Sequence, residues 1–123
     1  HPYLHKKCIK APPGLYFGYD DMGNYSVIVP FYSVDGELKT VQFRHLVGKG
    51  KYFLKGARQE DAFFTIGSFK DRDKIYLAEG LATAATIWEA LGEQAPVISF
   101  GSAAKLTAIV ATLQTEYPNV KLI

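Results

Sequence analysis

The hydrophobic pattern divides the chain into a first part with a period of two and a second part with alternating strand and helix periods. In the first part, apolar and polar residues alternate in "YSVIVPFYSVDGELKTVQFRH", which is typical of half-buried strands on either side of a turn at Asp35-Gly36. "KYFLKG" and "DAFFTIG" predict two more short strands, with another turn at Gly48-Lys49-Gly50. The opening "HPYLHKKCIKAPPG" predicts a short helix or extended arm that ends at its prolines. We expect a small β-rich N-terminal subdomain over residues 1–70.

The second part, residues 71–123, has the order β-α-β-α-β. "IYLAEG" and "APVISF" are short apolar runs typical of buried strands, and "NVKLI" begins a third. Gly92 predicts the end of the first helix and Tyr117-Pro118 the end of the second, while Ser102 is expected to cap the second helix. The helical faces expected to be buried are Leu81, Ala84, Ala85, Trp88 and Leu91 in the first helix, and Leu106, Ile109, Val110 and Leu113 in the second. This order predicts a parallel sheet with crossover helices, so the fold class is α/β, or α+β overall.

Composition is that of an ordinary folded domain. The chain has 123 residues, of which 48% are hydrophobic, and no apolar run approaches the roughly 20 residues that cross a bilayer. The single cysteine, Cys8, excludes an internal disulfide within these residues and a multi-cysteine zinc ribbon. No signal peptide is visible, and the expected location is the reducing cytoplasm.

Charge is distributed unevenly along the chain. Residues 1–60 contain nine Lys/Arg and five Asp/Glu, whereas residues 61–123 contain five and seven. The basic first half is also rich in aromatic residues, a combination that suits nucleic-acid contact and is equally compatible with a sheet core and solubilising lysines. The candidates for phosphate contacts cluster around the predicted hairpins: Arg44, His45, Lys49, Lys51, Lys55 and Arg58.

The first strand of the second part ends on a carboxylate, Glu79. Ligands of open α/β sheets gather at the carboxyl ends of strands, so Glu79 could bind Mg²⁺ or act as a general base. It could also do no more than complement the dipole of the following helix. A metal site needs acidic partners, and Asp71-Arg72-Asp73 is excluded because it precedes the same strand, roughly 20 Å away.

Other motifs are weaker. "SFGSAAK" offers hydroxyl and backbone N–H groups at a helix start, which could bind a phosphate or simply cap the helix. "GKGK" at residues 48–51 lacks the spacing of a phosphate-binding loop and is read as a basic turn. His1, His5 and Cys8 have ligand chemistry, but three residues on an opening arm are poor evidence for zinc.

The stretch "IYLAEGLATAATIWEALG" resembles the Toprim catalytic fold as it occurs in primases of conjugative plasmids, satellite phages and prophages. Those primases carry a Glu-Gly-Tyr-Ala-Thr-Ala signature, and residues 79–84 here read Glu-Gly-Leu-Ala-Thr-Ala. The resemblance continues through "VISFGSAAKLTAIVATLQTEYPNVKLI" and extends back over "HPYLHKKCIKAPPGLY", "VPFYSVDGELKTVQFRH" and "KYFLKGARQEDAFFTIG". Leu81 departs from the signature tyrosine, and "FGSAAK" stands where relatives often have Phe-Asp-Ala-Gly-Asn-Leu.

The resemblance implies RNA-primer synthesis on single-stranded DNA by Mg²⁺-dependent nucleotidyl transfer, during replication of a plasmid, phage or prophage. Glu79 would be the catalytic residue, or would help to organise the metal, and an Asp-x-Asp pair would be expected beyond Ile123. Gly80, Thr83, Ser102 and Lys105 would contact the substrate. The partners implied are single-stranded DNA, nucleoside triphosphates and possibly a helicase domain or subunit, with no membrane. On this reading the chain is a fragment with an incomplete Toprim-like sheet and no activity of its own.

Two alternatives remain open at this stage. One is another Toprim enzyme, a topoisomerase or nuclease, and the other is a non-catalytic nucleic-acid-binding module.

Overall fold

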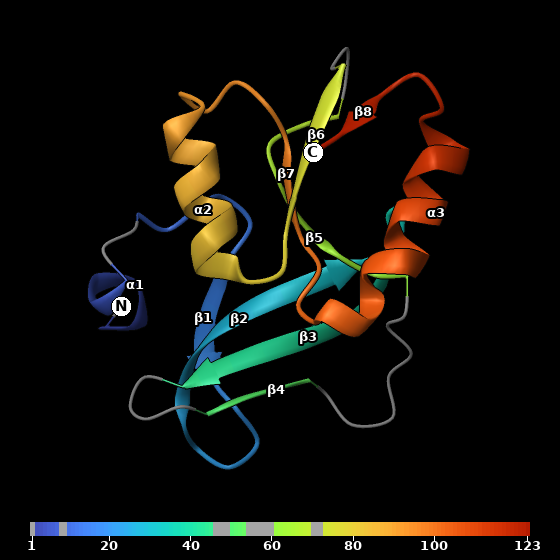
Figure 1. The fold of residues 1–123 in the computed structure, drawn as a ribbon. Helices are drawn as coiled ribbons and strands as arrows, with labels where there is room; N and C mark the ends of the chain where they lie inside the picture. Colours follow the sequence, from blue (N-terminus) through green and yellow to red (C-terminus); the bar gives the residue numbers. More distant parts are fainter. Residues whose placement is uncertain (1, 8–9, 46–49, 54–60, 70–72) are drawn as a thin grey trace.

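A computed structural model describes residues 2–7, 10–45, 50–53, 61–69 and 73–123 of the chain (Figure 1). The elements in chain order are α1 (Pro2–Lys6), β1 (Tyr16–Tyr19), β2 (Tyr25–Tyr32), β3 (Leu38–His45), β4 (Lys51–Phe53), β5 (Phe64–Ile66), β6 (Lys74–Ala78), α2 (Leu81–Ala90), β7 (Val97–Ser99), the 3₁₀ turn η1 (Ala103–Lys105), α3 (Leu106–Glu116) and β8 (Lys121–Leu122). The longest helix among these, α3, has 11 residues, and no helix in the described ranges is long and apolar enough to cross a membrane.

The first sheet is antiparallel, with strand order β1-β2-β3-β4. The predicted hairpin at Asp35-Gly36 is confirmed, because β2 and β3 pair across it and Gly36 N–H donates to the Ser33 carbonyl at 3.0 Å. The second predicted turn lies largely outside the described residues, although β3 and β4 do pair as antiparallel neighbours.

The second sheet has strand order β5-β7-β6-β8. β6 pairs in parallel with both β7 and β8, which confirms the predicted β-α-β-α-β order, and β5 adds an antiparallel edge next to β7. The sequence places β5 in the β-rich first part, but its strand hydrogen bonds are to β7 of the second sheet. The division of the chain at residue 70 stays a prediction.

The two helices cover opposite faces of the second sheet (Figure 1). Successive side chains of a strand point to opposite faces of the sheet, so each strand can contribute to the core under both helices. Ala78 and Val97 belong to one core cluster with Leu81 of α2, whereas Ile75 and Ile98 belong to the other cluster with Ile109 of α3. The sheet is thus buried on both sides, as its continuous apolar strands require.

The helix faces were predicted correctly for α2 and incorrectly at one position for α3. Leu81, Ala84 and Ala85 are buried, and α2 stops where Gly92 takes a positive φ of 64°. In α3, Ile109 and Leu113 are buried as expected, but Leu106 is 41% exposed. Because the 3₁₀ turn η1 precedes α3, the inward stripe at a spacing of four begins at Lys105 and leaves Leu106 outside.

The two sheets share one core. Val27, Val29 and Phe31 on the inner face of β2 belong to the same cluster as Leu81 of α2. A bridge between Tyr32 and Phe63, with two backbone hydrogen bonds of 2.9 Å, joins the end of β2 to the residue before β5. The first sheet therefore extends the core of the second sheet.

Gly101 is the tightest point of this packing, because it follows β7 and faces the first sheet. Its φ is +83°, and an added Cβ would lie 3.0 Å from atoms of the Phe31 and Phe53 rings. Residues other than glycine rarely adopt that φ. Moving two packed aromatic rings away from an added Cβ would also cost packing energy.

We expect Gly101→Ala to lower the free energy of unfolding by about 2–5 kcal/mol, from backbone strain plus overpacking. The matched control is Gly36→Ala, which has a similar φ of +89° but nothing within 4 Å of an added Cβ. That control should lose only the strain, about 1–2 kcal/mol. Urea denaturation followed by circular dichroism measures both, and equal losses would contradict the packing argument.

Candidate active site at the strand ends

The carboxyl ends of β6 and β7 form the site that the topology favours. These strands are parallel neighbours, and the chain leaves β6 toward α2 on one face and β7 toward α3 on the other. Connections that diverge in this way open a crevice at the strand ends, where open α/β sheets bind ligands. Glu79-Gly80 follows β6, and Phe100-Gly101-Ser102 follows β7.

Glu79 combines a fixed backbone with an exposed side chain. Its carbonyl accepts a hydrogen bond from Gly101 N–H at 2.7 Å and another from the buried Ser99 hydroxyl at 3.2 Å. One residue earlier, the Ala78 carbonyl accepts from Phe100 N–H at 3.0 Å. The side chain of Glu79 is exposed. The main chain of Glu79 is therefore fixed at the strand end, and its carboxylate is accessible to a ligand from solvent.

Gly80 leaves the start of α2 open. It is the N-cap residue, makes no side-chain capping hydrogen bond, and an added Cβ there would meet nothing within 4 Å. No acidic residue occupies the first turn of α2, and Thr83 on that turn is exposed. Because the first N–H groups of a helix and its dipole favour anions, this end can accept a phosphate next to Glu79.

Ser102 and Lys105 occupy different environments, although both follow β7. Ser102 is partly exposed at the start of η1, where its hydroxyl makes no capping hydrogen bond. Lys105 is only 8% exposed, and its Nζ donates to the Ala62 carbonyl at 2.6 Å. The same Nζ lies 4.6 Å from the Phe31 ring centroid and 5.6 Å from that of Phe53. Lys105 is thus part of the junction between the sheets, and its predicted contact with substrate stays a prediction.

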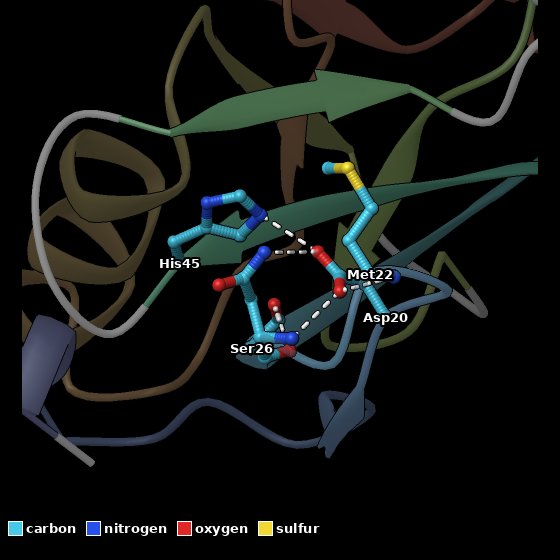
Figure 2. Close-up of polar contacts among 5 residues, drawn as sticks. Asp20, Met22, Ser26 and His45 are labelled. Atoms are coloured by element: carbon cyan, nitrogen blue, oxygen red, sulfur yellow. Dashed lines mark hydrogen bonds and ion pairs between the residues drawn. The ribbon is translucent and has the colours of Figure 1, made fainter.

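Arg44 and His45 point to opposite faces of the first sheet. Arg44 pairs with Val27 on the inner face, where its Nε donates to Gln42 Oε1 at 3.0 Å. His45 pairs with Ser26 on the outer face, and its Nε2 lies 2.8 Å from Asp20 Oδ2 (Figure 2).

Asp20 organises the turn between β1 and β2 as well as holding His45. Its side chain is fully buried, and Oδ1 accepts from the backbone N–H groups of Met22 at 2.9 Å and Asn24 at 2.8 Å (Figure 2). A buried carboxylate requires such partners. His45 therefore has a structural partner on the outer face, whereas Arg44 lies on the inner face beside Gln42.

The remaining cations predicted to bind nucleic acid cannot be placed at the level of side chains. Lys51 stands opposite Arg44 in the β3–β4 register. Lys49, Lys55 and Arg58 lie outside the described residues, so their roles stay predictions.

The donor set for a metal is incomplete among the described residues. No group of three or more His, Cys, Asp or Glu residues gathers there at one point. Asp73 precedes β6, at the opposite end of the strand from Glu79, as predicted. A lone carboxylate is a poor Mg²⁺ site, so the described residues do not by themselves fit the metal.

Sequence reasoning missed the residues that hold Glu79 in place. Ser99 and Gly101 act through a hydroxyl and an N–H group on a neighbouring strand, and only the β6–β7 register brings them to the Glu79 carbonyl. Gly101, the glycine after "VISF", is typical of a close backbone approach. Its spacing in the sequence does not predict that its N–H bonds to the Glu79 carbonyl.

The chain has relatives among curated proteins, although no family model matches it. It is 32% identical over 121 residues to DNA primase TraC from Escherichia coli, covering 96% of this chain and 11% of that protein. A second DNA primase TraC from Escherichia coli is 30% identical over 125 residues, covering 99% of this chain and 8% of that protein. This chain is homologous to part of a DNA primase. It spans about a tenth of the length of these relatives.

Solved primase structures share the fold. The primase fragment of the bacteriophage T7 primase-helicase protein superposes with a TM-score of 0.66 at 20% identity, covering 87% of this chain and 44% of that chain. A chain in the T7 lagging-strand DNA polymerase structure, which includes primase domains bound to an RNA/DNA hybrid and dTTP, gives a TM-score of 0.68 at 20% identity. That match covers 98% of this chain and 59% of the T7 chain. The mixed α/β arrangement of this primase relative is therefore that of the T7 fragment.

Replacing Lys105 separates a structural from a substrate-binding role. We expect Lys105→Met to lower the free energy of unfolding by about 1–3 kcal/mol, because the buried Ala62 carbonyl loses its donor. Urea denaturation measures this loss. The control Lys121→Met, at an exposed lysine on β8, should change it by less than about 0.5 kcal/mol. Unchanged stability together with lost nucleotide binding would show instead that Lys105 serves the substrate.

Proposed function

We propose that this chain is part of a Toprim-type DNA primase of the plasmid and phage kind, which synthesises RNA primers on single-stranded DNA. The homology to DNA primase TraC supports the class of activity. The Glu-Gly-Leu-Ala-Thr-Ala stretch lies across the end of β6 and the first turn of α2, which supports the Toprim assignment. Single-stranded DNA and nucleoside triphosphates are the partners that this proposal assigns to the complete protein.

The observation that carries the proposal is the exposed Glu79 carboxylate on a fixed backbone, beside an uncapped helix start. During nucleotidyl transfer, a primer hydroxyl loses a proton as its oxygen attacks the α-phosphate of the incoming nucleotide, the bond between the α- and β-phosphates breaks, and pyrophosphate leaves. Glu79 is placed to accept or relay such a proton. The first N–H groups of α2 can hold phosphate oxygens, and Gly80 leaves room for them to approach.

Mg²⁺ in primases of this kind would neutralise phosphate charge during the transfer. Of the residues described, Glu79 would be its ligand, and this proposal requires further acidic residues in the complete protein. The role of Glu79 as a proton acceptor does not depend on that expectation.

We expect Glu79→Gln to lower the primer-synthesis rate of the full-length protein by about 10²–10⁴-fold, because an amide cannot accept the proton. The matched control is Asp73→Asn, since Asp73 is an exposed carboxylate at the other end of β6. That control should leave the rate unchanged. Incorporation of labelled ribonucleotides on a single-stranded template measures both rates.

Two results would contradict this proposal. Equal rates for Glu79→Gln and the wild type would remove Glu79 from catalysis. A wild-type protein that binds single-stranded DNA but makes no primer under any divalent cation would favour the non-catalytic binding module.

A further inference from the structure

We propose that the exposed half of the first sheet's inner face is a base-stacking platform for single-stranded DNA, built by Phe17, Tyr19, Tyr25 and Arg44. This inference rests on the proposed function, because it names where the single strand would lie. It keeps Arg44 from the cations that the sequence predicted to contact phosphates, and it adds a specific set of aromatic rings beside that residue.

Strand register places these four side chains on one face. Tyr19 pairs with Tyr25, Phe17 pairs with Val27, and Val27 pairs with Arg44, and directly paired residues of antiparallel strands share a face. Further along the same face of β2, Val29 and Phe31 are buried in the core. The inner face therefore has a covered half under α2 and an uncovered half that ends in aromatic rings.

The rings on the uncovered half are exposed to solvent. Tyr19 is 72% exposed, and Phe17 and Tyr25 are also exposed. Tyr19 and Tyr25 contact each other edge to face, with ring centroids 5.2 Å apart and an interplanar angle of 64°. Exposed rings at a sheet surface, held by each other and by the strands, lose little entropy when a base stacks on them.

Charge at this surface favours a nucleic acid over an apolar partner. Arg44 lies across Val27 from Phe17 on the same face and is oriented by Gln42, which is 1% exposed and accepts from the Arg44 Nε. The Gln42 Nε2 donor is buried and has no hydrogen-bond partner in the described part of the chain. Residues 1–60 carry nine basic and five acidic side chains, so the surrounding subdomain attracts phosphates. Rings for bases next to a cation for the backbone are the combination that binds single strands.

The platform continues a face of β2 whose buried residues share a core cluster with both neighbours of Glu79-Gly80. Ala78 and Leu81 flank Glu79-Gly80, and both belong to the core cluster that includes Val27. Tyr25, Phe17 and Arg44 are the next residues outward from Val27 on that face. Figure 1 shows the β6–α2 connection above β1 and β2. A strand lying on the rings would thus approach the crevice that holds Glu79.

A pair of tyrosines on β1 provides the test. Tyr19 lies on the platform, whereas Tyr16 is 59% exposed on the opposite face of the same strand. We expect Tyr19→Ala to weaken binding of a fluorescein-labelled oligodeoxythymidine of about 12 nucleotides by about 5- to 100-fold. Tyr16→Ala should bind like the wild type, and Tyr19→Phe should retain the affinity because the ring remains. Fluorescence anisotropy at several salt concentrations gives each dissociation constant.

Two further measurements identify stacking as the cause. An abasic oligonucleotide of the same length should bind the wild type and Tyr19→Ala equally, because it offers no base to stack. The slope of affinity against salt should be unchanged in Tyr19→Ala, since no phosphate contact is lost, but should fall in magnitude in Arg44→Gln. Circular dichroism checks that each variant is folded.

The outcomes separate the platform from the proposed function. If the wild type binds the oligonucleotide and Tyr19→Ala binds it as tightly, the platform is wrong and the primase proposal stands. If the wild type does not bind single strands at low salt, the platform is wrong, whereas the primase proposal is decided separately by primer synthesis with Glu79→Gln. If Tyr19→Ala instead abolishes self-association of the chain in sedimentation and leaves DNA binding unchanged, the rings form a protein interface and the platform is overturned.

Discussion

The arrangement of the site depends on the hydrogen-bonded joint between the carboxyl ends of β6 and β7. The Gly101 N–H and the Ser99 hydroxyl both donate to the Glu79 carbonyl, and Phe100 N–H donates to that of Ala78. These bonds satisfy backbone groups at the point where the segments after β6 and β7 diverge to opposite faces of the sheet. As a result, the exposed side chain of Glu79 extends from a main chain that is fixed by two hydrogen bonds to its carbonyl. An exposed carboxylate on a mobile loop could not be positioned in this way.

The same joint connects the two sheets. Gly101 packs against the Phe31 and Phe53 rings, and four residues later Lys105 reaches over those rings to the Ala62 carbonyl. Burying an ammonium is costly unless it is hydrogen-bonded, and two aromatic faces add an electrostatic attraction. The junction thus uses a polar, directional contact in an otherwise apolar core. Directional contacts fix orientation better than apolar packing alone, so we infer that Lys105 helps to set how the first sheet sits against the second.

One face of the first sheet has a buried region and an exposed region. Val27, Val29 and Phe31 continue the core of the second sheet, whereas Phe17, Tyr19 and Tyr25 continue the same face beyond it. Homology to part of DNA primase TraC and the fold shared with the T7 primase fragment are the context in which we propose that a single strand and a nucleotide meet here. In our proposals the crevice at Glu79 receives the nucleotide and the aromatic half of the sheet receives the template.

Local pattern alone was enough to predict most of the elements. The period of two around Asp35-Gly36 specified the first hairpin, and the apolar run before Glu79 specified a buried strand followed by a helix. These features depend on neighbours in sequence, so propensity and turn chemistry determine them. The placement of Glu79 at a strand end, away from Asp73, followed from the same pattern.

Tertiary structure alone decided the contacts between distant segments. β5 belongs to the second sheet because it pairs with β7. The two strands are more than thirty residues apart, so no local pattern could predict this pairing. Lys105 turned inward and Leu106 outward because the 3₁₀ turn η1 shifted the start of α3, and because Ala62 and Phe31 offered the ammonium a site. Strand register decided which exposed rings share a face. Hydrogen bonds between separate strands set that register, and no local sequence pattern encodes it.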